Sequence, residues 1–269
     1  MDAGYWAAKP FIDQRLGGLI GMLGLGAKYL DELRKLIDRI EKTQSENIAE
    51  AADAIVDSVS QGGAVHVLDT GHMLMNELFG RAGGLMMPRP VNIKMEVDNP
   101  GPARPGKTKE MVYLDEIPGL PEFILDRSDI YPGDVLIIGS VSGKNALPVG
   151  LALLARERGI KVIALTSVAY SSSLEAQHPS GKHLFEAADI VLDNCGVIGD
   201  AILEVEGLDT KAIPTSGIAA ACLMWTLEAE IIDRMLKRGL TPQVWKSNHL
   251  PGAGEFNRKA LAETERVGY

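Results

Sequence analysis

Residues 134–145 read "DVLIIGSVSGKN", and this stretch decides the fold. An unbroken apolar run ends in a group of small and hydroxyl residues. An amphipathic helical pattern, "ALPVGLALLARERG" (146–159), then follows and closes at Gly159. Continuous apolar strands, unlike alternating ones, are typical of a parallel sheet that is covered by helices on both faces.

The same rhythm extends outward in both directions. Apolar runs that predict strands occur at "AVHVLD" (64–69), "KVIALT" (161–166) and "DIVLDN" (189–194), with helical patterns over about 28–60 and 216–238. Residues 86–118 hold five prolines in their first 26 positions and predict a long loop near the strand ends. We therefore predict an α/β fold, a three-layer αβα sandwich with a five-stranded parallel sheet of the flavodoxin-like type.

The domain organisation is one domain, 28–269, preceded by an extension, 1–27. The segment "LGGLIGMLGLGA" (16–27) is apolar but too short to span a bilayer. We expect it to pack on the domain or on a partner subunit, as part of an N-terminal helical extension.

Composition narrows the classes of function. The 269 residues are 46% hydrophobic and 23% charged, which suits an ordered globular chain. The net charge is −9 and no basic block stands out, so a nucleic-acid partner is not expected. Two distant cysteines without a CxxC spacing predict reduced thiols in a cytoplasmic protein.

Hydroxyl residues lie at the ends of three predicted strand-like runs, the third of which is "TKAIPT" (210–215) before the last helix. These groups are Ser140-Val141-Ser142-Gly143, Thr166-Ser167 and Thr215-Ser216. Ligands of parallel α/β sheets bind at the carboxyl ends of the strands, and free N–H groups at helix N-termini attract anions. The alternative is that these residues simply cap helices. Because neither a Walker A nor a GxGxxG motif is present, we expect a phosphorylated small molecule without a bound cofactor.

At this point the motifs resemble the SIS (sugar isomerase) domain. The motifs that carry this resemblance are Ser140-x-Ser142-Gly143, "TGH" (70–72), Thr166-Ser167, "HPSGKHLFEAADIVLDN" (178–194) and "EVEGLDTKAIPTSG" (204–217). They are similar to a bacterial family of sugar-isomerase-domain proteins of undefined substrate, over roughly residues 30–260 by the spacing of elements. The resemblance implies a phosphosugar ligand held by Ser140, Ser142 and Asn145 with support from Ser167, and places Thr70 and Gly71 at the same site.

The sequence departs from the family pattern at several positions. Asp69 and Met73 replace a small residue and a hydroxyl around "TGH", and Val141 stands where relatives have a polar side chain. The C-terminal segment reads Glu255-Phe256-Asn257, without the usual histidine before the asparagine. The identity of the sugar is therefore left open.

Candidate catalytic groups come partly from the resemblance. "NELFGR" (76–81) is similar to the glutamate-bearing helix of phosphoheptose isomerases, which implies Glu77 as the catalytic base on a helix starting near His72. The alternative is an i,i+4 pair with Arg81. His72 is either a donor to a sugar oxygen or a cap. No metal is expected on this helix, because Met73 stands where zinc-binding relatives have histidine.

Other candidates lie elsewhere in the chain. Glu204 and Glu206 fall on one side of an extended segment and are either an acid–base pair or a charged edge. Lys107 and His249 are possible sugar or phosphate contacts, whereas His66 is expected to be a buried core histidine.

Three functions fit this set of residues. The first is a phosphosugar isomerase that interconverts aldose and ketose through an enediol. The second is a phosphosugar lyase or etherase. The third is a non-catalytic phosphosugar-binding sensor. In each case we expect a homodimer or a larger homo-oligomer, with no membrane partner.

Overall fold

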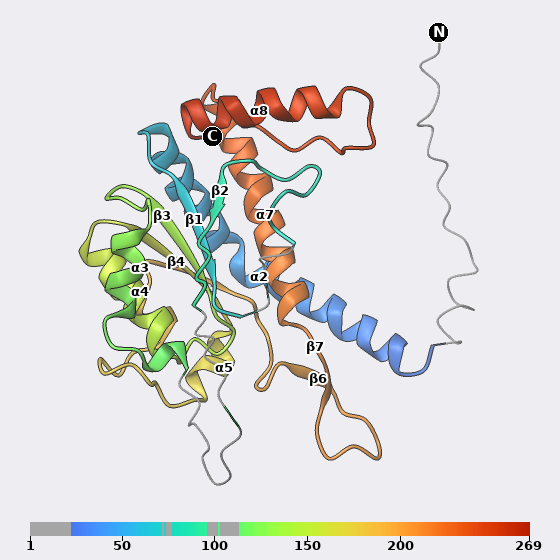
Figure 1. Ribbon diagram of the computed structural model, residues 1–269. Helices are drawn as coiled ribbons and strands as arrows, with labels where there is room; N and C mark the ends of the chain where they lie inside the picture. The colour runs from blue at the N-terminus through green and yellow to red at the C-terminus, as the bar shows by residue number, and fades with distance from the viewer. Residues whose placement is uncertain (1–22, 72, 74–76, 96–101, 103–112) are drawn as a thin grey trace.

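The chain forms an αβα sandwich in which helices cover both faces of a parallel sheet (Figure 1). The computed structural model describes residues 23–71, 73, 77–95, 102 and 113–269. The predicted fold class is confirmed.

Five strands make up the sheet, in the order β2-β1-β3-β4-β5. They are β1 (Val65–Asp69), β2 (Pro88–Pro90), β3 (Val135–Gly139), β4 (Lys161–Thr166) and β5 (Ile190–Asp193), and all neighbouring pairs are parallel. The register pairs Asp69 with Gly139 and Gly139 with Leu165, so the ends of β1, β3 and β4 lie level. Segments that follow these strands therefore meet at one edge of the sheet.

The core has two parts, one on each face of the sheet. On one face α2 (Leu25–Ser60) and α7 (Ser216–Lys237) pack against Val67, Ile137 and Ile163. On the other face α3 (Leu120–Arg127), α4 (Ala146–Glu157) and α6 (Leu184–Ala187) pack against Leu136 and Ile138. Successive strand residues point to opposite faces, which is why the strands are apolar without interruption.

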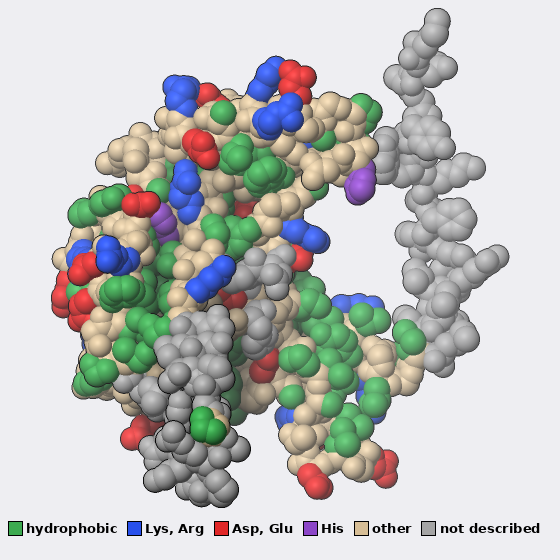
Figure 2. Space-filling view, viewed as in Figure 1, with side chains coloured by type: hydrophobic (Ala, Val, Ile, Leu, Met, Phe, Trp, Pro, Cys, Tyr) green, Lys and Arg blue, Asp and Glu red, His purple; other side chains and the backbone are tan. Residues whose placement is uncertain are grey.

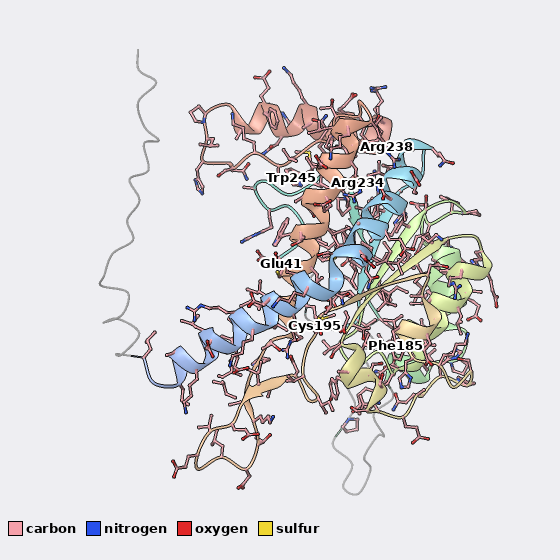
Figure 3. The ribbon with its side chains drawn as sticks, turned by 180° about the vertical axis from the view of Figure 1, so that it is seen from behind. Glu41, Phe185, Cys195, Arg234, Arg238 and Trp245 are labelled. Atoms are coloured by element: carbon pink, nitrogen blue, oxygen red, sulfur yellow. The ribbon has the colours of Figure 1, made fainter. Side chains whose placement is uncertain are left out.

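Ion pairs join α7 to α2 near the C-terminal ends of both helices. Arg234 Nε lies 2.9 Å from Asp53 Oδ1, and Arg238 Nη1 lies 2.5 Å from Asp57 Oδ1. Both arginines extend from α7 beside α2 in Figure 3. They add to the apolar packing between the two helices that cover this face.

One strand of the sheet lies where a loop was predicted. β2 falls within the proline-rich segment 86–118 and pairs with β1 alone, through Val65–Pro88 and Val67–Pro90. Proline is tolerated on an edge strand because one side of that strand needs no ladder donor. The segment also contains the 3-10 helix η1 (Leu114–Glu116).

A second correction concerns the run before the last long helix. β7 (Ala212–Pro214) pairs antiparallel with β6 (Ala201–Leu203) in a separate two-stranded sheet. This hairpin projects from the sandwich near the start of α7 (Figure 1). The prediction that Thr215-Ser216 ends a strand of the parallel sheet is therefore wrong.

Three local features also differ from the predictions. Glu77 lies in a turn followed by bends over Leu78–Gly80, so the expected helix does not cover these residues. The tail forms a helix, α8 (Ala253–Val267), that was not predicted. The helix α3 was not predicted either. The short helix α5 (Val168–Ser172) follows β4.

Candidate functional site

Backbone hydrogen bonds from three later segments hold the turn between β3 and α4, residues 140–145, in place. The carbonyl oxygens of Val141, Gly143 and Lys144 accept hydrogen bonds from backbone N–H groups of later segments. The donors are Ser167 at 3.1 Å, Leu184 at 2.7 Å and Gln177 at 2.9 Å, respectively. Because these carbonyls are engaged by the protein, the hydroxyl and N–H groups are what the turn offers at the carboxyl ends of the strands.

Those remaining groups are hydrogen-bond donors. The hydroxyls of Ser140 and Ser142 make no hydrogen bond to a described residue, although Ser140 is only 7% exposed. The amide N–H groups of Ser142, Gly143 and Lys144 likewise have no acceptor among the described residues. Ser140 is buried and Ser142 is half-buried, so the turn holds a group of donors that no described residue uses.

Gly143 fixes the shape of the turn. Its φ of +55° lies in the left-handed region that favours glycine. A Cβ at this position would come within 2.8 Å of Thr166 Oγ1 and 2.9 Å of Ser171 Oγ. The Ser171 hydroxyl is buried without a hydrogen-bond partner in the part of the chain that is described. No local sequence pattern singles out Ser171, which lies inside the short helix α5.

The N-terminus of α4 already holds a carboxylate. Asp115 Oδ1 accepts from the Leu147 N–H at 3.2 Å, and its Oδ2 accepts from Asn145 Nδ2 at 2.8 Å. A negative charge at this position is favoured by the helix dipole. Asn145, predicted as a phosphate contact, thus uses one amide hydrogen on Asp115. No sequence signal connected Asp115 with this turn, because the two are 30 residues apart.

The predicted Thr166-Ser167 pair lies directly below the turn and is fully buried. Thr166 donates to the Val141 carbonyl at 3.2 Å. Ser167 donates to the Gly196 carbonyl at 2.9 Å and accepts from the Tyr170 N–H at 3.3 Å as the N-cap of α5. Both hydroxyls therefore support the turn and the β4–β5 connection.

The end of β1 brings a carboxylate next to the end of β3. The Thr70 hydroxyl and N–H both donate to the Gly139 carbonyl at 3.0 Å, and the Gly71 N–H donates to Asp69 Oδ1 at 3.1 Å. A Cβ on Gly139 would lie 3.2 Å from Asp69 Oδ1 and 3.3 Å from Met73 Cε. The two unusual residues of this segment thus lie beside the strand end that leads into Ser140.

The other sequence candidates are more dispersed. Glu77 is half-buried and pairs with Arg81, with 3.3 Å between Oε1 and Nη2. Glu204, which is 83% exposed, lies 3.4 Å from Lys211 Nζ beyond β6, and Glu206 is also exposed. His249 is exposed in a turn before α8. His72 and Lys107 lie outside the described residues.

The turn before α7 is closed by the protein itself. Asp200 Oδ1 accepts from the backbone N–H groups of Thr215 at 3.1 Å and Ser216 at 2.8 Å. Its Oδ2 accepts from the Ser216 hydroxyl, also at 2.8 Å. The Asp200 carboxylate therefore caps this helix start, and it engages the N–H and hydroxyl groups of both Thr215 and Ser216.

Two buried acids, Asp134 and Glu228, lie away from the carboxyl ends of the strands. His66 pairs with Asp134 at 3.3 Å between Nε2 and Oδ2, and burial lowers the pKa of the histidine, as expected for a core residue. On α7, burial raises the pKa of Glu228 to about 7. Its Oε2 accepts from the Leu85 N–H at 2.9 Å, and its Oε1 has no partner among the described residues.

Two cavities lie at opposite ends of the sheet. The larger, about 1190 Å³, lies at the amino ends of the strands, and within its lining Arg156 pairs with Asp189. The smaller, about 830 Å³, lies next to the β3–α4 turn and includes Lys144 and Asn145. Ligands of parallel sheets bind at the second type of position.

The described residues show neither a metal-binding cluster nor a membrane-spanning helix. They contain no group of three His, Cys, Asp or Glu side chains arranged to hold a metal ion. Among the helices described, none is long and apolar enough to cross a membrane.

Comparison with known families agrees with this geometry. The SIS domain model matches residues 28–167, which include β1, β3, the β3–α4 turn and β4. The match defines the class of protein as an SIS-domain protein.

Curated relatives define the family more narrowly. The chain is 37% identical over 243 residues to a UPF0309 protein of Caldanaerobacter subterraneus, covering 88% of this chain and 96% of the relative. It is 34% identical over 249 residues to the UPF0309 protein of Streptomyces griseus, covering 91% and 97%. The chain belongs to the UPF0309 family of SIS-domain proteins.

Two solved structures are similar to this chain at low sequence identity. The phosphoheptose isomerase of Neisseria gonorrhoeae is 16% identical, with a TM-score of 0.46, covering 78% of this chain and 96% of that one. The Vibrio vulnificus NanR protein, complexed with ManNAc-6P, is 13% identical, with a TM-score of 0.43, covering 94% of this chain and 71% of that one.

Proposed function

We propose that this UPF0309 protein binds a phosphorylated sugar with its phosphate on the β3–α4 turn and interconverts aldose and ketose forms through an enediol. The observation that carries the proposal is the donor surplus of this turn. Two serine hydroxyls and three successive amides have no acceptor among the described residues, whereas the adjacent carbonyls are engaged. A phosphate offers acceptor oxygens and negative charge for such a set.

The chemical step needs a base beside the sugar. In this proposal Glu77 takes a proton from the carbon next to the carbonyl and returns it to the neighbouring carbon, as aldose–ketose isomerisation requires. Its half-buried position after the β1 end and its pairing with Arg81 are compatible with a carboxylate held ready for that transfer. Asp69, beside Gly139, is close enough to the turn to hold a sugar hydroxyl.

Binding is tested first by thermal-shift titration with hexose, heptose and amino-sugar phosphates. A sugar phosphate should stabilise the wild type and leave the double variant Ser140→Ala/Ser142→Ala unchanged. Ser247→Ala, in the segment before α8, is the control and should respond like the wild type. No response of the wild type to any sugar phosphate would overturn the proposal.

Catalysis is tested on the ligand found in this way. Glu77→Gln should bind it with similar affinity and lose turnover, measured by exchange of the substrate proton with deuterium. Turnover equal to that of the wild type would remove Glu77 as the base. Binding by the wild type without exchange or cleavage would instead identify a phosphosugar sensor.

We also propose that the chain assembles as a homo-oligomer through α2 and the β6–β7 hairpin. Leu25, Leu30, Ile213 and Ile218 are 43–47% exposed on these elements and the start of α7. Figure 2 shows hydrophobic side chains gathered over the hairpin and the adjoining helices. Leu30→Asp should shift the mass measured by light scattering to that of a monomer, and a wild-type monomer would contradict this proposal.

A further inference from the structure

A cleft beside the β3–α4 turn has no assigned role. It lies between η1, the start of α3, the start of α4 and the loop 177–179, and its volume is about 830 Å³. That volume falls within the range of small-molecule binding pockets. We call it the α3–α4 cleft, and its polar lining consists of Asp115, Glu122, Lys144, Asn145, Gln177 and His178.

Both donors and acceptors in the cleft are available to a ligand. Lys144 is half-buried and forms no ion pair with a described residue. The His178 ring accepts the Ser180 N–H at Nδ1, 3.1 Å away, so its contact with Ser180 leaves Nε2 unused. The Asp115 carboxylate has further lone pairs beyond the two it uses on Asn145 and Leu147.

The rest of the lining is apolar. Leu114 is 39% exposed, Ile117 is half-buried, and Pro118 and Pro121 belong to the same wall. An apolar wall next to a few placed polar groups is the usual composition of a small-molecule site. With two carboxylates and one ammonium, the cleft carries a formal charge of −1, which disfavours a second phosphate.

We propose that the α3–α4 cleft receives an N-acyl group on the sugar, so that the substrate class is phosphorylated N-acyl amino sugars. The amide N–H would donate to a carboxylate, the carbonyl would accept from Lys144 or His178, and the alkyl group would pack on Leu114. This inference rests on the proposed phosphate site. Asn145 lies three positions after Ser142, a span of at most about 11 Å, so one small ligand reaches both places.

The test compares three ligands that differ in one group: an N-acetylhexosamine 6-phosphate, the hexosamine 6-phosphate and the hexose 6-phosphate. Isothermal titration should give a Kd for the N-acetyl compound roughly tenfold or more below the other two, since burying a small apolar group in a matched pocket gives discrimination of that order. Leu114→Ser should reduce this ratio several-fold. Leu208→Ser, at an exposed leucine beyond β6, should leave the ratio unchanged.

The outcomes separate this inference from the proposed function. Equal Kd values for the three ligands, or a preference for the amine or the hydroxyl, would overturn the role of the cleft. If Ser140→Ala/Ser142→Ala then removed binding of all three, the phosphate site would stand alone. Absence of binding by every phosphosugar would overturn both.

Discussion

Two turns in this protein share a Ser-Gly pair before a helix but differ in what their hydroxyls contact. The β3–α4 turn begins "SVSGKN" (140–145), and the segment that opens α7 reads "PTSGIA" (214–219). In the first, Ser140 and Ser142 keep their hydroxyls unengaged by any described residue, whereas in the second the Asp200 carboxylate takes the N–H and hydroxyl of Ser216. Each helix start receives a carboxylate from another segment, Asp115 at α4 and Asp200 at α7, but only at α7 does that carboxylate also take a serine hydroxyl.

The two glycines of these turns give the largest expected contrast. Gly143 has a φ of +55° and no room for a Cβ, whereas Gly217 has no atom within 4 Å of a Cβ position. Gly143→Ala should lower the free energy of unfolding by about 2–4 kcal/mol through backbone strain and overpacking. Gly217→Ala should raise it by about 0.5 kcal/mol, because alanine favours the helix. Urea unfolding measures both, and equal effects would break the comparison.

The serine hydroxyls should separate the two turns by ligand affinity. Ser140→Ala/Ser142→Ala removes two hydrogen bonds to a charged group, so the Kd for the sugar phosphate should rise at least about 100-fold. The free energy of unfolding of the unliganded variant should change by less than about 1 kcal/mol, since neither hydroxyl has a described partner. An unchanged Kd would show that the phosphate lies elsewhere.

A change of pH should affect the α7 side of the molecule. The pKa of Glu228 is raised to about 7 by burial, so folding favours its neutral form. This penalty on ionisation is absent below the unfolded pKa of 4.5, grows between pH 4.5 and 7, and is at most about 3 kcal/mol above pH 7. Glu228→Gln should therefore stabilise the protein at pH 8 and change little at pH 4.5. The same difference at both pH values would contradict the assignment.

The reverse of the serine experiment should affect stability and leave ligand affinity unchanged. Ser216→Ala removes the 2.8 Å hydrogen bond to Asp200 and should lower the free energy of unfolding by about 1–2 kcal/mol. Its Kd for the sugar phosphate should equal that of the wild type. A weaker Kd would bring the α7 turn into the ligand site.

Much of the fold was predictable, because buried parallel strands and amphipathic helices leave strong patterns in the sequence. The strands that carry Leu136 and Ile163 and the long helix α2 were predicted within a few residues. β2 was not, because an edge strand of Pro-Arg-Pro has no apolar pattern.

The site was predictable only where its residues are consecutive. Ser140, Ser142 and Gly143 share one turn, as local sequence indicated. Asp115 and Asp200 act on helix starts 30 and 16 residues away, so their effect depends on tertiary contacts that no local pattern encodes.

The most direct test of the phosphate site is an NMR titration of the ¹⁵N-labelled protein with the sugar phosphate that stabilises it. The account predicts that the amide signals of Ser142, Gly143 and Lys144 shift with a common Kd, while those of Thr215 and Ser216 stay in place. Shifts at Thr215 and Ser216 with unmoved signals at 142–144 would contradict it.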